Sequence, residues 1–129
     1  MTDFKKSSMS KKNILIIDDD ARNIFALTAT LKSRSFDCVS CLGAEEALEL
    51  LKGDVIVDCI LIDMMMPNMD GYEAIPLIKA IPHRQNIPVV AVTAQAMVGD
   101  REKCLRAGAD DYISKPIDVD KLMKMLSTL

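Results

Sequence analysis

The sequence predicts a doubly wound α/β fold, in which helices cover both faces of a five-stranded parallel sheet. The chain of 129 residues has the length of a single domain. Short apolar runs alternate with amphipathic segments along it, which is the pattern of repeated strand–helix units. The runs are rich in Ile, Val and Leu with little alternation, as expected when helices bury both faces of each strand.

The predicted strands and helices alternate in five pairs along the chain. Apolar runs predict the strands, and segments of ten or so residues with a helical apolar period predict the helices. The pairs, with the strand first and the helix second, span 13–17 and 21–33, 37–41 and 44–52, 57–62 and 71–80, 88–93 and 98–107, 112–114 and 119–126.

Capping residues mark the starts of three predicted helices. Asp20 precedes the first helix, Asp70 precedes the third with Glu73 three residues later, and Asp118 precedes the last. Pro76 conflicts with the third helix, because proline lacks a backbone donor and crowds the preceding turn. We therefore expect this helix to begin irregularly or to bend at Pro76.

Charge and apolar pattern limit the location and partners of the chain. Residues 1–12 contain four lysines among serines, so we expect a mobile tail ahead of a domain at 13–129.

The formal net charge is −3. The chain as a whole is therefore not a polycation, and no nucleic-acid partner is expected. No apolar run approaches the roughly 18 residues of a membrane span, and no signal-peptide core follows Met1. We expect a cytoplasmic protein without membrane contact.

Cys38 and Cys41 have the spacing of a metal or redox motif. On the predicted strand, however, positions three apart point to opposite faces, and no histidine or second motif lies nearby to complete a zinc site. We expect these two residues, with Cys59 and Cys104, to be small buried thiols.

The ends of the predicted strands carry the polar residues that suggest a function. The functional crevice of an open α/β sheet lies beyond the carboxyl ends of its strands. Carboxylates gathered there repel one another unless they share a cation, and magnesium (Mg2+) prefers such oxygen ligands and bridges to phosphate. The residues at these ends are Asp18, Asp19 and Asp20 at the end of the first strand, Asp63 at the end of the third, Thr93 at the end of the fourth and Lys115 at the end of the fifth.

Each of these residues has a role in phosphoryl transfer, which depends on positioning and charge stabilisation. Asp63 is the candidate nucleophile, and we expect it to face solvent at the rim. Thr93 can donate its hydroxyl to one phosphoryl oxygen, and Lys115 can supply charge to another. No general base is needed, because the carboxylate is already ionised at neutral pH. The only histidine, His83, lies in a polar loop.

Each residue also has an ordinary structural explanation. Thr93 could cap a turn, Lys115 could be a solvated surface lysine, and the acidic run could cap a helix. Tyr112, three residues before Lys115, could be a half-buried sheet aromatic. Complementary phosphoryl-binding groups at four strand ends nevertheless favour a phosphoryl site.

The same residues resemble the receiver domain of bacterial two-component response regulators. The stretches "DDDARNIFALTATL" and "AQAMVGDREKCLRAGADDYISKPID" are similar to receivers of hybrid histidine kinases. The resemblance covers 13–129 and implies a flavodoxin-like sheet with strand order 2-1-3-4-5. The motifs that carry it are Ile16-Ile17-Asp18-Asp19, Asp63 with Pro67 and Asp70-Gly71 beyond it, Thr93-Ala94, and Lys115-Pro116.

The resemblance assigns the metal ligands and the phosphoacceptor. Asp63 matches the phosphorylated aspartate. Asp19 and Asp63 match direct magnesium ligands, with the backbone carbonyl of Met65 as a third and Asp18 acting largely through water. Met65 and Gln95 match positions that tune dephosphorylation.

The resemblance also implies a switch. Thr93 and Lys115 match the groups that bind the phosphoryl, and the Lys115–Pro116 peptide matches a cis bond. Thr93 and Tyr112 match a pair in which the hydroxyl moves toward the phosphoryl group and the aromatic ring turns into the space left behind. This movement would reshape the face made by the fourth helix, fifth strand and fifth helix.

The function implied is a phosphoacceptor signalling domain, not an enzyme beyond its own phosphorylation and dephosphorylation. The phosphoryl group would come from a histidine kinase or a phosphotransfer protein, and the reshaped face would bind a downstream protein. The alternative is a magnesium-dependent phosphohydrolase acting through an aspartyl phosphate. That alternative needs a dedicated acid/base and a substrate pocket, and the sequence indicates neither.

Overall fold

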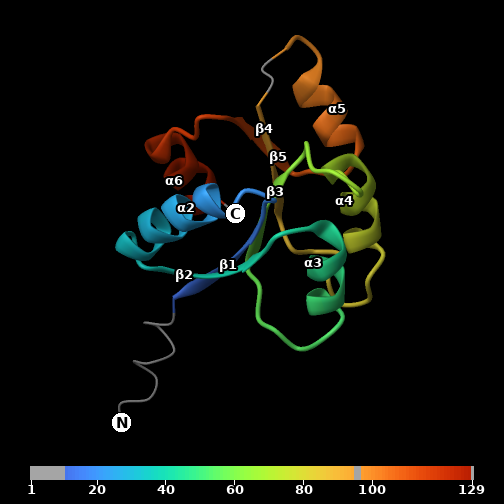
Figure 1. Ribbon diagram of the computed structural model, residues 1–129, viewed down its shortest axis with the longest axis horizontal. Coiled ribbons are helices and arrows are strands. Elements are labelled where there is room, and N and C mark those ends of the chain that lie inside the picture. Colours follow the sequence, from blue (N-terminus) through green and yellow to red (C-terminus); the bar gives the residue numbers. More distant parts are fainter. Residues whose placement is uncertain (1–10, 95–96, 129) are drawn as a thin grey trace.

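The computed structural model describes residues 11–94 and 97–128. In that part of the chain, strands and helices alternate as predicted (Figure 1). Residues 1–10 of the expected tail lie outside the described residues. The elements are β1 (Lys12–Ile17), α2 (Ala21–Ser33), β2 (Phe36–Cys41), α3 (Ala44–Leu51), β3 (Cys59–Asp63), α4 (Gly71–Lys79), β4 (Val89–Thr93), α5 (Asp100–Arg106), β5 (Asp111–Ser114) and α6 (Val119–Ser127).

The five strands form one parallel sheet with the order β2-β1-β3-β4-β5. This order confirms the predicted doubly wound, flavodoxin-like fold. The chain leaves β1 toward β2 on one side and returns to place β3 on the other side. The crevice expected at such a reversal therefore lies beyond the carboxyl ends of β1 and β3.

Helices cover both faces of the sheet (Figure 1). Helices α2 and α6 pack on one face, and α3, α4 and α5 pack on the other. Strand β1 shows how the sequence supplies both cores: Ile14 and Ile16 join the α2–α6 side, whereas Leu15 and Ile17 join the α3–α5 side. The unbroken apolar runs are explained by this double burial.

Cys38 and Cys41 lie on opposite faces of the sheet, as predicted from strand geometry, but the expected burial of all four thiols is wrong for Cys38. Cys41 belongs to the core on the α3–α5 side, while Cys38 packs on the α2–α6 side. Cys59 and Cys104 are buried, and Cys38 is only partly buried. Burial raises the pKa of Cys59 to about 12, so this thiol stays protonated at neutral pH.

Two helix starts differ from expectation. Helix α4 begins regularly, since Asp70 and Glu73 form a complete capping box, and it continues through Pro76. The expected irregular start is therefore wrong, and the alternative, a bend at Pro76, stays a prediction. Helix α5 begins at Asp100 instead of 98, because Gly99 adopts a left-handed φ of 93° that does not fit a helix. No helix in the described ranges is both long and apolar enough to span a bilayer.

Candidate functional site

Three carboxylates gather at the carboxyl ends of β1 and β3. The register places Ile17 of β1 beside Ile62 of β3, so the residues that follow lie side by side. One oxygen from each of Asp18, Asp19 and Asp63 lies within 4.8 Å of the others. Three oxygen ligands this close fit a hard divalent ion such as magnesium.

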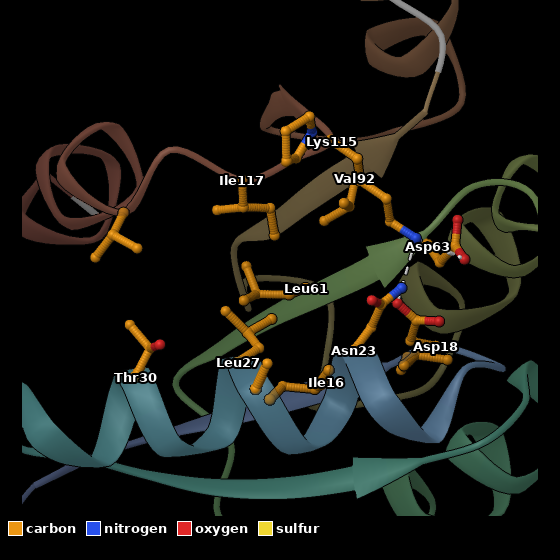
Figure 2. Close-up of a pocket in the computed structure, with 14 residues that line it drawn as sticks. Ile16, Asp18, Asn23, Leu27, Thr30, Leu61, Asp63, Val92, Lys115 and Ile117 are labelled. Carbon is orange, nitrogen blue, oxygen red and sulfur yellow. Dashed lines mark hydrogen bonds and ion pairs between the residues drawn. The ribbon is translucent and has the colours of Figure 1, made fainter.

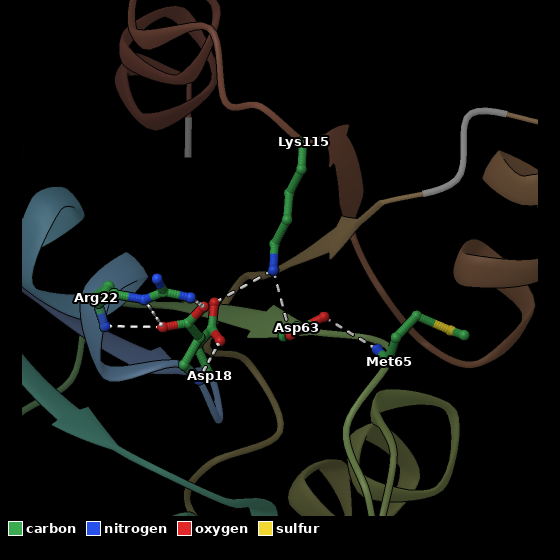
Figure 3. Close-up of polar contacts among 6 residues, drawn as sticks. Asp18, Arg22, Asp63, Met65 and Lys115 are labelled. Atoms are coloured by element: carbon green, nitrogen blue, oxygen red, sulfur yellow. Dashed lines mark hydrogen bonds and ion pairs between the residues drawn. The ribbon is translucent and has the colours of Figure 1, made fainter.

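Lys115 reaches this carboxylate cluster from the segment after β5 (Figure 3). Its Nζ lies 3.4 Å from Asp18 Oδ2 and 3.3 Å from Asp63 Oδ2, so one ammonium bridges two acids. Its backbone N–H donates to the Thr93 carbonyl at 2.7 Å, and the Lys115–Pro116 peptide is cis as the resemblance implies. Burial lowers the pKa of Lys115, but the charges of Asp63 and Asp18 raise it overall.

Asp63 is buried in the crevice, with only 5 % of its surface exposed. The expectation that it faces solvent at the rim is therefore wrong. The physical reason is its place on β3, which is flanked by β1 and β4. Asp63 Oδ1 accepts a hydrogen bond from the Met65 N–H at 3.0 Å. Burial raises the pKa of Asp63, and the contacts with Met65 and Lys115 offset this only in part.

The two residues of the proposed switch lie on β4 and β5. Thr93 ends β4, next to the strand that carries Asp63, and is 2 % exposed. Tyr112 is half-buried and packs against the core on the α3–α5 side. The structure thus brings Thr93 to the same strand edge as the carboxylate cluster. Gln95 lies outside the described residues.

Asp20 has a structural position at the start of α2, and the methionines after β3 are either buried or exposed. Asp20 is outside the carboxylate cluster and instead caps α2, where its carboxylate accepts a hydrogen bond from the Arg22 N–H at 2.9 Å. Met64 and Met66 are buried beneath the loop after β3, whereas Met65 is 52 % exposed. The Met65 side chain extends away from Asp63 and Lys115 (Figure 3).

A cavity of about 460 Å³ lies beside the carboxylate cluster, between α2 and residues 115–119 (Figure 2). Asp18, Asp63 and Lys115 line its polar end together with Asn23. Sequence reasoning missed Asn23. Its position as the third residue of α2 could have indicated it. Helical side chains lean toward the start of the helix, and the start of α2 lies near the carboxyl ends of the strands.

Comparison with known proteins gives one consistent family. A family model described as response regulator receiver domain matches residues 14–127. The signal transduction histidine-protein kinase BarA of Escherichia coli K12 is 39 % identical over 126 residues, which cover 98 % of this chain and 13 % of that kinase. The chain therefore spans only about an eighth of the length of this relative.

Solved structures give the same result. The receiver domain of sensor histidine kinase PA1611 from Pseudomonas aeruginosa PAO1, with magnesium coordinated in its active-site cleft, has a TM-score of 0.83 and 32 % identity over 92 % of this chain and 96 % of that one. The receiver domain of Ssk1 from Saccharomyces cerevisiae, crystallised with the histidine phosphotransfer protein Ypd1, has a TM-score of 0.81 and 26 % identity over 92 % and 88 %.

Proposed function

Because the chain belongs to the response regulator receiver domain family of two-component systems, we propose that it accepts a phosphoryl group on Asp63. The donor would be a histidine kinase or a histidine phosphotransfer protein, as the complex of Ypd1 with the Ssk1 receiver suggests by analogy. We infer a receiver domain at 13–129, in keeping with the family match over 14–127.

One observation carries this proposal: three carboxylates at the ends of the neighbouring strands β1 and β3 meet one lysine that follows β5. The carboxylate oxygens lie within 4.8 Å of one another, and Lys115 contacts both Asp18 and Asp63. Such a group is electrostatically unfavourable without a further cation. It also supplies the charges that a phosphoryl group needs on arrival.

Asp18, Asp19 and Asp63, with the Met65 carbonyl, would hold magnesium. When bound, magnesium neutralises negative charge on the cluster and on the phosphoryl oxygens. The magnesium ion in the cleft of the PA1611 receiver supports this assignment by similarity. Asp18 is 7 % exposed and would act mainly through metal-bound water.

Asp63 would attack phosphorus through a carboxylate oxygen, forming an O–P bond as the P–N bond of the donor phosphohistidine breaks. The leaving imidazole takes up a proton, and no base on this chain is required. Lys115 would move from its two carboxylates toward a phosphoryl oxygen, and Thr93 would donate its hydroxyl to another. These contacts favour the phosphorylated arrangement of Thr93 and Tyr112.

The output would be a change in the face formed by α5, β5 and α6. Tyr112 lies on β5 between those helices in sequence and is only half-buried, so rotation of its ring would alter the surface beside it. A downstream protein that binds one arrangement better than the other would read the phosphorylation state.

Intact-mass spectrometry after incubation with acetyl phosphate and magnesium tests the phosphoacceptor assignment. We expect one phosphoryl group per chain, lost on Asp63→Asn and retained on Asp54→Asn, which alters an exposed acid. Phosphorylation that persists in Asp63→Asn would contradict the assignment. Multiple turnovers on a small phosphomonoester, saturable and lost with Asp63→Asn, would instead support the phosphohydrolase alternative.

A further inference from the structure

The cavity beside the carboxylate cluster has the size of a small-molecule site. Its volume of about 460 Å³ lies within the range of roughly 300–1,000 Å³ that is typical of ligand pockets. Leu27 of α2, Leu61 and Val92 of the sheet, and Ile117 after β5 supply its apolar walls (Figure 2). Thr30 places a hydroxyl-bearing side chain along the same α2 wall.

Helix α2 leaves this space because it packs loosely on the sheet. Of its 13 residues, Leu31 alone is fully buried. Ile24 and Leu27 reach the core only in part, and Phe25 is exposed. An apolar body in the cavity would complete the burial of the inner side of α2.

The charge at the polar end selects the kind of head group that fits. Asp18 and Asp63 line this end, Asp19 lies in the same carboxylate cluster but outside the lining, and Lys115 supplies one ammonium, so the negative charges are in excess. A second cation is therefore favoured over an anion. The Asn23 amide adds an oxygen that can accept a hydrogen bond at the same end.

We propose that this cavity binds a hydrophobic amine, with its ammonium on the Asp18 carboxylate and its apolar body between α2 and Ile117. The carboxylate cluster would attract the ammonium group, and the apolar walls of the cavity would contact the rest of the amine. A metal ion has no apolar part to place against these walls. Magnesium and the amine both require Asp18, so they compete. The further consequence, that such an amine inhibits phosphorylation, rests on the proposed function; the binding itself does not.

Isothermal titration calorimetry with 4-phenylbutylamine tests the proposal without any phosphodonor. We expect one amine per chain, with an apparent Kd that rises as magnesium is added. Butylamine, which lacks the ring, should bind at least tenfold more weakly, because it buries less apolar area. The matched acid 4-phenylbutyrate should show no saturable binding over the same range. Equal binding of the acid, or no saturation by the amine, would overturn the proposal.

Two variants of α2 locate the site. Ala26 lines the cavity, and Ala29 is exposed on the same helix outside that lining. Ala26→Leu should weaken 4-phenylbutylamine binding at least tenfold by filling the cavity, whereas Ala29→Leu should change it less than twofold. Thermal unfolding checks that both variants fold, and Thr30→Leu provides a second filling change. Unaltered affinity in both Ala26→Leu and Thr30→Leu would refute the assignment.

Discussion

In the crevice, the cost of burying a charged side chain is offset only in part by its hydrogen bonds and ion pairs. Asp63 loses water contact because its strand lies inside the sheet, and it regains a hydrogen bond from Met65 and an ion pair with Lys115. Burial still dominates, since the pKa of Asp63 lies above its ordinary value. The buried carboxylate therefore reduces stability at neutral pH, as expected of a group at the proposed phosphoacceptor position.

Asp63→Asn should stabilise the metal-free protein in a pH-dependent way. Well below the ordinary pKa of 3.8, Asp63 is protonated in both folded and unfolded chains and the substitution has little effect. As pH rises through the raised pKa, the folded wild type loses stability because ionisation is harder there than in the unfolded chain. At pH 7 the variant should therefore be the more stable of the two.

Urea unfolding in buffer with a metal chelator, from pH 3 to pH 8, measures this difference. Asp54→Asn, which alters an exposed acid, is the control for replacing an acid with an amide. A gap for Asp63→Asn that shrinks with rising pH would contradict the interpretation.

At the scale of elements, the turn that leads into α4 depends on close packing. A Cβ on Gly71 would lie 2.8 Å from the Cα of Met64 and would also contact the Met64 sulfur. The Gly71 N–H donates to the Met64 carbonyl, and Met64 itself is fully buried. The loop after Asp63 therefore packs directly against Gly71, the first residue of α4, and leaves no room there for a side chain.

Gly71→Ala should destabilise the protein by roughly 1–3 kcal/mol, because the backbone of Met64 must shift to admit a methyl group. Gly53→Ala is the matched control: its added Cβ would meet only the Leu50 carbonyl oxygen, at 3.5 Å. Chemical denaturation of both variants measures the difference. Equal stability of the two would show that the turn can relax.

Arg84 joins two segments of the chain at the amino ends of the strands, opposite the end that carries the carboxylate cluster. It is 5 % exposed, and its guanidinium donates to the carbonyls of Leu51, Gly53 and Val55 at 2.8–2.9 Å. These acceptors lie at the end of α3 and just after it, where a cation also complements the helix dipole. One side chain thereby holds the segment before β3 against the segment before β4.

Arg84→Met should cost roughly 2–4 kcal/mol, because it leaves buried carbonyl groups without donors. Arg101→Met, at an exposed position of α5, should change stability by less than about 0.5 kcal/mol. Thermal and urea unfolding measure both. A mild effect of Arg84→Met would mean that water replaces the guanidinium.

For the whole molecule, magnesium should act as a stabilising ligand. A site present only in the folded chain raises the free energy of unfolding by about 2.7 kcal/mol at a magnesium concentration of one hundred times Kd. Asp19→Asn should reduce this gain, whereas Asp20→Asn should preserve it, since Asp20 lies outside the cluster and asparagine also caps helices. Melting curves with and without magnesium provide the readout. Equal loss in both variants would place the ion elsewhere.

Much of the molecule follows from local pattern. The double burial of β1 is encoded in its unbroken apolar run, so the strand ends and their polar residues were predictable. The reversal between β1 and β3 was expected only from the family resemblance. The burial of Asp63 was not predictable, because the apolar run predicts a strand that ends at residue 62, whereas β3 includes Asp63. Arg84 gave no signal either, since arginine is usually exposed. The cavity depends on side-chain volumes across α2, the sheet and residues 115–119, which periodicity does not describe.

The placement of Cys38 and Cys41 has a practical consequence. Although only two residues separate them, their side chains enter cores on opposite sides of the sheet. An oxidant therefore cannot close a ring between them while β2 stays intact, and Cys41, Cys59 and Cys104 are buried. Handling in air without reductant should consequently join one chain to another through Cys38, rather than cross-link either chain internally.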